Sequence, residues 1–202
     1  MRLIFKLSLV SFFLALCVTT GFAQPQPKTA QTPVPAETSS GVIIFPEIEG
    51  WTKGEITRYP TVELGYSLPY RSEGGVVVTV YAYPGNNRTI PDSLDGIVKK
   101  EFEKAKSDIF AVGKQGVYKD VKEIKSETLV LGGSGGKIRA LHALFTFSIQ
   151  GRDVNSEIYL FPYQNRFIKI RATRPVSLGK EADTELAELL AELDSFLVKP
   201  GK

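Results

Sequence analysis

Three consecutive segments between residues 136 and 174 alternate apolar and polar side chains at every second position. In the first of them, Leu141, Ala143 and Phe145 share one face while His142 and Leu144 share the other. A period of two is the mark of a β-strand. Turn-forming residues at 150–153 and 162–165 separate the segments, and such short connections join antiparallel neighbours. The sequence therefore predicts a three-stranded antiparallel meander, with its second strand over 154–163 and its third over 166–173.

The rest of the chain predicts further strands and two helices. Strand-forming segments precede the meander at 42–45, 55–59, 62–70, 76–83 and 117–130. Helical spacing begins at Pro91, a residue suited to a first helical turn, and recurs over 181–198, where Leu186, Leu189, Leu190 and Leu193 form a continuous stripe. The predicted fold class is α+β, an antiparallel sheet covered by helices in one domain over residues 42–199.

The first 41 residues differ in composition from the predicted domain. Arg2 and Lys6 precede an apolar run, and small residues before position 24 predict a signal peptide over 1–23, cleaved after Ala23. Residues 24–41 are rich in Pro, Thr and Ser and predict an extended linker. An uncleaved anchor and lipidation at Cys17, the single cysteine, are the alternatives. We expect an exported protein, periplasmic or extracellular, with no stable membrane span after cleavage.

The charge of the mature chain argues against nucleic-acid binding. Removing residues 1–23 takes away Arg2 and Lys6 and no acidic residue, so 23 basic and 22 acidic residues remain and the net charge falls from +3 to +1. Nucleic-acid binding needs a clustered positive field. We therefore expect no nucleic-acid partner.

The sequence offers little that could support catalysis. The Gly-rich stretch at 132–137 lacks the spacing of a phosphate-binding loop and precedes a predicted strand, which favours a hairpin loop. His142 is the only histidine, so a histidine-based metal cluster is excluded, and no nucleophile elbow lies near it. The carboxylate pairs Glu47/Glu49 and Glu55/Glu63 are ordinary for exposed segments. We predict no catalytic residue, no metal ligand and no cofactor.

One group of side chains is a candidate binding site. Lys169 and Arg171 share a face of the third meander strand, and Glu157 and Tyr159 share a face of the second. If these two faces coincide, all four lie together, with His142 beside them. Such a patch would bind an anionic ligand or an acidic loop of a partner; the alternative is a set of cross-strand charge pairs.

The order of elements resembles the Mog1/PsbP family. The resemblance is carried by the Gly50-Trp51 turn, the strand over 76–83 that leads to a helix, and the hairpin from Tyr159-Leu160-Phe161 to Phe167-Ile168-Lys169-Ile170-Arg171. It covers residues 42–198 and implies an α/β/α sandwich. Family members are mostly non-catalytic: one branch binds a small nuclear GTPase, and another assists photosystem II in the thylakoid lumen. The resemblance transfers no functional residue to this chain.

Three hypotheses of function follow. The first is an exported, non-enzymatic binding or accessory module that acts through a protein partner in the cell envelope. The second is a small-molecule or ion carrier that uses the face of Lys169 and Arg171. The third is a hydrolase of unknown specificity that uses His142 or a carboxylate pair.

Overall fold

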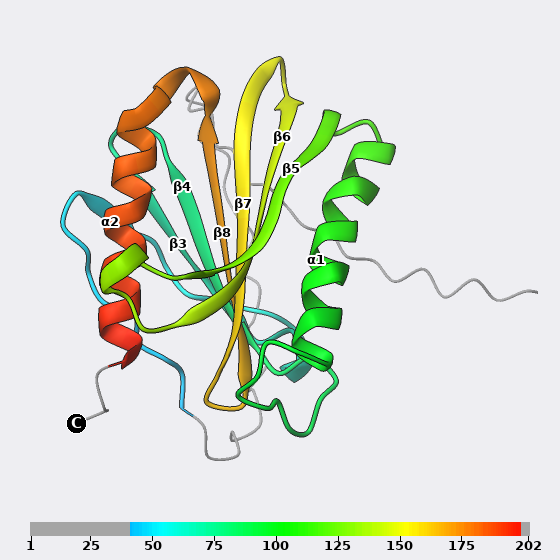
Figure 1. Ribbon diagram of the computed structural model, residues 1–202, viewed down its shortest axis with the longest axis vertical. Coiled ribbons are helices and arrows are strands. Elements are labelled where there is room, and N and C mark those ends of the chain that lie inside the picture. The colour runs from blue at the N-terminus through cyan, green and yellow to red at the C-terminus, as the bar shows by residue number, and fades with distance from the viewer. Residues whose placement is uncertain (1–40, 199–202) are drawn as a thin grey trace, which may run out of the picture. The chain divides into compact units, whose positions relative to one another are not determined.

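The computed structural model describes residues 41–198 (Figure 1). The predicted signal peptide with Cys17, and residues 24–40 of the predicted linker over 24–41, lie outside this range. Its elements in chain order are β1 (Trp51–Lys53), β2 (Thr57–Arg58), the 3-10 turn η1 (Val62–Leu64), β3 (Tyr66–Ser72), β4 (Val77–Tyr83), α1 (Ile97–Lys114), β5 (Lys119–Val130), the 3-10 turn η2 (Gly133–Gly135), β6 (Arg139–Ile149), β7 (Arg152–Tyr163), β8 (Arg166–Pro175), the 3-10 turn η3 (Val176–Leu178) and α2 (Gly179–Val198).

The strands form one antiparallel sheet in the order β1-β3-β4-β8-β7-β6-β5, and β2 pairs with the outer side of β3. The predicted meander is confirmed as β6, β7 and β8. Its last strand, β8, also pairs with β4, so that it joins the meander to the earlier strands. The α+β fold class is confirmed: an antiparallel sheet with a helix packed on each face.

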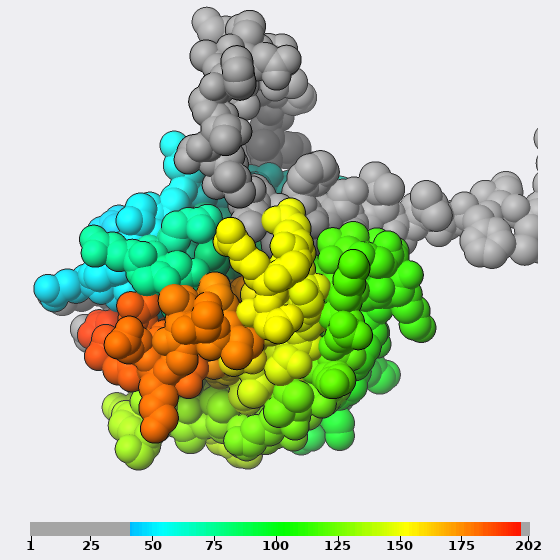
Figure 2. Space-filling view, turned by 90° about the horizontal axis from the view of Figure 1, so that it is seen from above, coloured from blue at the N-terminus to red at the C-terminus, as the bar shows by residue number. Residues whose placement is uncertain are grey.

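The two helices lie on opposite faces of the sheet and toward opposite ends of it (Figure 1). Helix α2 buries Leu189 and Leu193 in a core that includes Leu68 and Ile170. Helix α1 packs on β5, β6 and β7 in a second core, built from residues that include Val98, Phe102, Ile109, Phe145, Leu160 and Phe167. Figure 2 shows the β6–β7 hairpin, in yellow, between the orange segment that leads into α2 and the green α1–β5 segment. Both predicted helices therefore exist, each with the apolar face that its spacing predicted.

The first helix begins six residues later than predicted, at Ile97 and not at Pro91. Residues 84–96 form a loop because long-range hydrogen bonds hold their backbone: Ile90 N donates to Asn165 Oδ1 at 2.7 Å, and Asn165 Nδ2 donates to Arg88 O. Ile90 is buried as part of this loop, so the apolar spacing that begins before Ile97 belongs to a packed loop. Gly96, with φ +60°, then turns the chain into the helix.

Two predicted strands also differ. Residues 42–45 form no strand; Ile43 N instead donates to the hydroxyl of Tyr66, and the hydroxyl of Tyr70 donates to Pro46 O, while Phe45 is buried. The predicted strand over 62–70 is divided by Gly65, whose φ of +61° few other residues adopt. The turn η1 precedes it and β3 follows.

Within residues 41–198, neither helix has the length and apolar character that crossing a bilayer would take.

Candidate functional site

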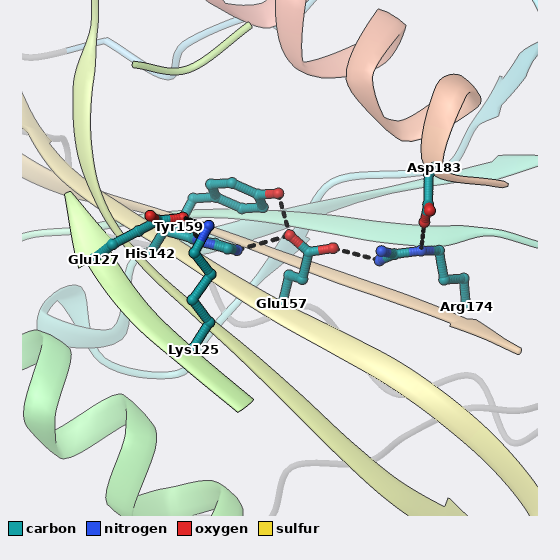
Figure 3. Close-up of polar contacts among 7 residues, drawn as sticks. All are labelled: Lys125, Glu127, His142, Glu157, Tyr159, Arg174 and Asp183. Atoms are coloured by element: carbon teal, nitrogen blue, oxygen red, sulfur yellow. Dashed lines mark hydrogen bonds and ion pairs between the residues drawn. The ribbon is translucent and has the colours of Figure 1, made fainter. Parts of the chain in front are cut away.

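The buried carboxylate of Glu157 is the centre of a polar cluster on the α2 side of the sheet (Figure 3). Its Oε2 accepts hydrogen bonds from the hydroxyl of Tyr159 and from Nε2 of His142, the latter at 2.7 Å. Its Oε1 lies 2.5 Å from Nη1 of Arg174, which donates to it. Only 6% of Glu157 is exposed. We call this set the Glu157 cluster, completed by Glu127 and Asp183 at its two ends.

The strand register explains why these residues meet. His142 lies directly opposite Tyr159 in the β6–β7 pair and opposite Glu127 in the β5–β6 pair. Directly opposed residues of an antiparallel pair lie on the same face. The rings of His142 and Tyr159 stack with their centres 4.6 Å apart. The cluster thus crosses the sheet from β5 to β8 and ends at α2, where Arg174 Nε donates to Asp183 at 2.8 Å.

His142 lies between two carboxylates. Its Nε2 donates to Glu157, and its Nδ1 lies 3.4 Å from Glu127 Oε1, an ion-pair distance without hydrogen-bond geometry. Lys125 pairs with the same Glu127 oxygen at 2.6 Å. His142 is itself only 5% exposed. Both ring nitrogens therefore face protein carboxylates, and neither is presented to a ligand.

The charges of the cluster stabilise one another. Burial would raise the pKa of Glu157, but hydrogen bonds from His142 and Tyr159 and the charge of Arg174 outweigh it and lower that pKa to about 2. Burial and the neighbouring Glu157 charge raise the pKa of the Tyr159 phenol, so Tyr159 is a donor. Burial opposes the charge of Arg174, yet Glu157 and Asp183 raise its pKa. Glu157 is consequently an ionised, fully engaged carboxylate at neutral pH.

The expected single patch of Lys169, Arg171, Glu157, Tyr159 and His142 is wrong. Glu157 lies opposite Ala172 and Tyr159 opposite Ile170, whereas Lys169 lies opposite Leu160 and Arg171 opposite Ile158. Since opposed residues share a face, Lys169 and Arg171 lie on the α1 side and the other three on the α2 side. Successive side chains of β8 point to opposite faces of the sheet. The sequence alone did not determine which of them share a face with Glu157 and Tyr159 of β7.

On the α1 side, aromatic side chains surround the two cations. Nζ of Lys169 lies 4.6 Å from the ring centre of Tyr81, and Nη2 of Arg171 donates to the hydroxyl of Tyr118 at 3.1 Å. Burial, followed by the charge of Arg171, lowers the pKa of Lys169 to about 8. Glu101 and Asp108, which belong to α1, act in the opposite direction. Both cationic side chains are half-buried and are therefore partly shielded from water.

The Gly-rich loop at 132–136 packs against α2, as a hairpin connection between β5 and β6. Asp194 of α2 anchors it: the buried carboxylate accepts hydrogen bonds from the backbone N–H groups of Lys137 and Ile138 at 2.8–3.1 Å. A shallow cavity of about 490 Å³ lies between this loop and α2, with Leu129, Leu190 and Tyr159 among its lining residues. The loop is therefore fixed by a helix side chain and serves the fold.

Sequence reasoning missed Arg174, Glu127 and Asp183. A signal for Arg174 existed, because it follows Ile168, Ile170 and Ala172 at two-residue intervals and so lies on their apolar face. Glu127 gave no such signal, since two register shifts in the β5–β6 pair decide what it opposes. In residues 41–198, no three acidic or histidine side chains are grouped so that they could hold a metal ion.

Comparisons with known proteins yield a likeness of fold. No model of a known protein family matches the chain, and no curated protein matches it. Among solved structures, the chain is similar to the solution structure of cyanobacterial PsbP (CyanoP) from Synechocystis sp. PCC 6803, with 10% sequence identity and a TM-score of 0.47 over 72% of this chain and 81% of that chain. This similarity agrees with the predicted resemblance to the Mog1/PsbP family and concerns the fold alone.

Proposed function

We propose that this protein is exported and acts as a non-catalytic binding module through a protein partner in the cell envelope. The observation that carries the proposal is an exposed apolar turn at the edge of the sheet, formed by Ile56, Val62 and Leu64. Of Val62, 80% is exposed, and of Leu64, 53%. Eight large apolar side chains are exposed in residues 41–198, and three of them fall within these nine residues. Exposed apolar side chains concentrated in one short segment are a candidate interaction surface, whereas scattered single residues need no such explanation.

Backbone contacts hold this turn in place. Tyr59 N donates to Gly65 O and Gly85 N donates to Glu63 O, each at 3.0 Å. A Cβ atom at Gly65 would lie 2.0 Å from the carbonyl oxygen of Ala82, so the turn approaches β4 closely. A surface that is already ordered loses less conformational entropy when a partner binds. The turn is therefore suited to contact with a partner.

The Glu157 cluster supports the non-catalytic part of the proposal. Its histidine and its central carboxylate are buried, and each polar contact described above joins one member to another. A catalytic acid or base must reach the proton that it transfers. The groups of this cluster instead hold β5, β6, β7, β8 and α2 together.

The predicted signal peptide and linker indicate the compartment in which the proposed partner would be found. A cleaved signal would deliver the chain beyond the cytoplasmic membrane, and the linker over 24–41 would separate the domain from its amino terminus by an extended segment. We therefore place the partner among proteins of the envelope.

The test is site-specific photo-crosslinking in cells that export the full chain. A photoreactive amino acid at Val62 is compared with the same amino acid at Val117, which is 52% exposed but lies between α1 and β5, at the far end of the sheet. We expect one dominant adduct from position 62 that is absent from position 117 and is lost on Leu64→Asp. Identical background adducts at both positions, or no adduct at position 62, would refute the proposal.

A further inference from the structure

Arg171 and Arg174 lie three residues apart on the same strand and on opposite faces of the sheet. Their surroundings differ in whether a carboxylate pairs with the guanidinium. Arg174 pairs with the carboxylates of Glu157 and Asp183. Arg171 donates to the neutral hydroxyl of Tyr118, and among residues 41–198 it has no carboxylate partner. Its Nε is shielded from solvent and has no hydrogen-bond partner within that range. A half-buried guanidinium without a carboxylate partner is costly, and an anion beside it would offset part of that cost.

Hydroxyl groups surround this guanidinium on the α1 side of the sheet. Thr79 lies directly opposite Arg171 in the β4–β8 pair. Thr173 is the next residue on the same face of β8 and lies opposite Ser156, with their hydroxyl oxygens 3.3 Å apart. Together with Tyr118 these side chains form what we call the Arg171 patch: Thr79, Tyr118, Ser156, Arg171 and Thr173. Hydroxyls can donate to an oxyanion without contributing a negative charge that would repel it.

The position of Tyr118 fixes the guanidinium. The ring of Tyr118 stacks on Phe147 with 4.1 Å between ring centres, and Tyr118 is buried. Its hydroxyl accepts from Arg171, whose guanidinium carbon lies 5.8 Å from the same ring centre. A planar guanidinium held in one place presents its N–H groups in a fixed fork, which matches the two oxygens of a carboxylate or phosphate.

The electric field along β8 favours an anion at this end. Lys169 lies two residues from Arg171 on the same face and adds a second positive charge. The acidic residues of α1 that act on Lys169 are Glu101 and Asp108, and Glu101 is engaged with the hydroxyl of Tyr83 and with Lys104. Their charges act on Lys169. The Arg171 end, toward Thr173, has hydroxyl neighbours instead.

We propose that the Arg171 patch binds a small oxyanion, the carboxylate or the phosphate group of a small molecule. Arg171 supplies the charge and the fork, and the half-buried hydroxyl of Thr173 supplies a further donor. Fully buried Ser156 holds the Thr173 hydroxyl in place, and the hydroxyl of Thr79 is engaged with Tyr81. This site lies on the α1 face and does not depend on the apolar turn or on a protein partner.

The test measures the melting temperature of the purified, exported chain in sodium phosphate, sulfate and acetate, each compared with sodium chloride at equal ionic strength. A bound anion raises the melting temperature with its concentration. We expect a saturable rise in at least one of the three salts. Sulfate and phosphate also raise melting temperatures because they are excluded from the protein surface, so only a saturable rise that Arg171→Lys weakens counts as binding. Such a rise in phosphate and sulfate alone identifies a tetrahedral group, and such a rise in acetate identifies a carboxylate.

Arg171→Lys is the decisive variant, because it keeps the positive charge and removes the fork. We expect it to weaken the apparent affinity about tenfold or more, while Arg139→Lys, at an exposed arginine of β6, leaves it unchanged. Amide chemical shifts should move at Thr79, Arg171 and Thr173 on titration. No rise above the chloride reference, or an equal rise in Arg171→Lys, would overturn the proposal.

Discussion

Replacing Glu157 with glutamine should destabilise the domain by an amount that depends on pH. The pKa of Glu157 falls from its usual 4.5 to about 2 in the folded protein. At about 1.4 kcal/mol for each pH unit, that difference corresponds to about 3 kcal/mol of stability from the ionised carboxylate. A glutamine side chain would carry no charge and would also turn an amide N–H₂ toward a donor, since all three partners of Glu157 donate to it. We therefore expect Glu157→Gln to lose about 3 kcal/mol at pH 7.

The sign of the pH dependence follows from the lowered pKa. Because the folded state binds the proton less readily than the unfolded chain, the stabilisation is complete above the unfolded pKa of 4.5 and is lost as the pH falls toward 2. Urea denaturation of wild type and Glu157→Gln should show nearly the same gap at pH 7 and pH 4.5, and less than half of it at pH 3. Glu188→Gln, at an exposed position on α2, should leave the denaturation midpoint in place at each pH.

A second substitution tests whether the loss in Glu157→Gln comes from the unpaired charge of Arg174. Arg174→Met in the Glu157→Gln background removes the cation that has lost its buried partner, so the double variant should recover part of the loss. A loss below about 1 kcal/mol in Glu157→Gln, a gap that does not change with pH, or a double variant with the two costs simply added would refute the electrostatic account of this cluster.

The remaining predictions concern the Gly-rich loop and the amino terminus. Gly136→Ala should destabilise the domain by about 2 kcal/mol or more in thermal or urea unfolding, because a Cβ there would lie 1.8 Å from Leu131 O, while Gly135→Ala, with open space, should be nearly neutral; equal effects would contradict the loop geometry. Asp194→Ala should cost about 1–3 kcal/mol by leaving two backbone N–H groups without an acceptor, and Glu192→Ala, exposed on the same helix, is the control. Mass spectrometry of the exported chain should find a mature terminus at Gln24; a retained Met1 would favour the uncleaved anchor, and a lipid on Cys17 the lipoprotein.

Periodicity predicted most of the fold because one face of each long element is buried. The apolar spacing of β6, β7, β8 and α2 follows directly from the cores that they line. It failed where a loop is buried: Ile90 and Leu94 pack like helix residues, although hydrogen bonds to Asn165 hold Ile90 and Arg88 in a loop. No local pattern reports a partner 75 positions away.

The candidate site was predicted only in part, because the facing of neighbouring strands is a property of their register. Glu157, Tyr159 and His142 do meet, but Arg171 and Lys169 point to the opposite side of the sheet. Each strand taken alone gives two alternate sets of side chains, and only the pairing of Glu157 with Ala172 decides which sets match. Arg174 is the partner of Glu157 that the sequence analysis missed. It lies three positions after Arg171, and an odd spacing along one strand places the two side chains on opposite faces of the sheet.

The place of β8 in the middle of the sheet has a consequence for the order in which an exported chain can fold. Val80 of β4 pairs with Ile170, 90 positions later, and the apolar face of β3 and β4 is covered by α2, which ends the described chain. Contacts between residues so distant in sequence form slowly. A chain that emerges from a translocation pore with its amino terminus first must therefore keep β3 and β4 exposed until nearly all of it has crossed. If this chain is exported as proposed, whatever shields those strands during transit acts before the domain has a core of its own.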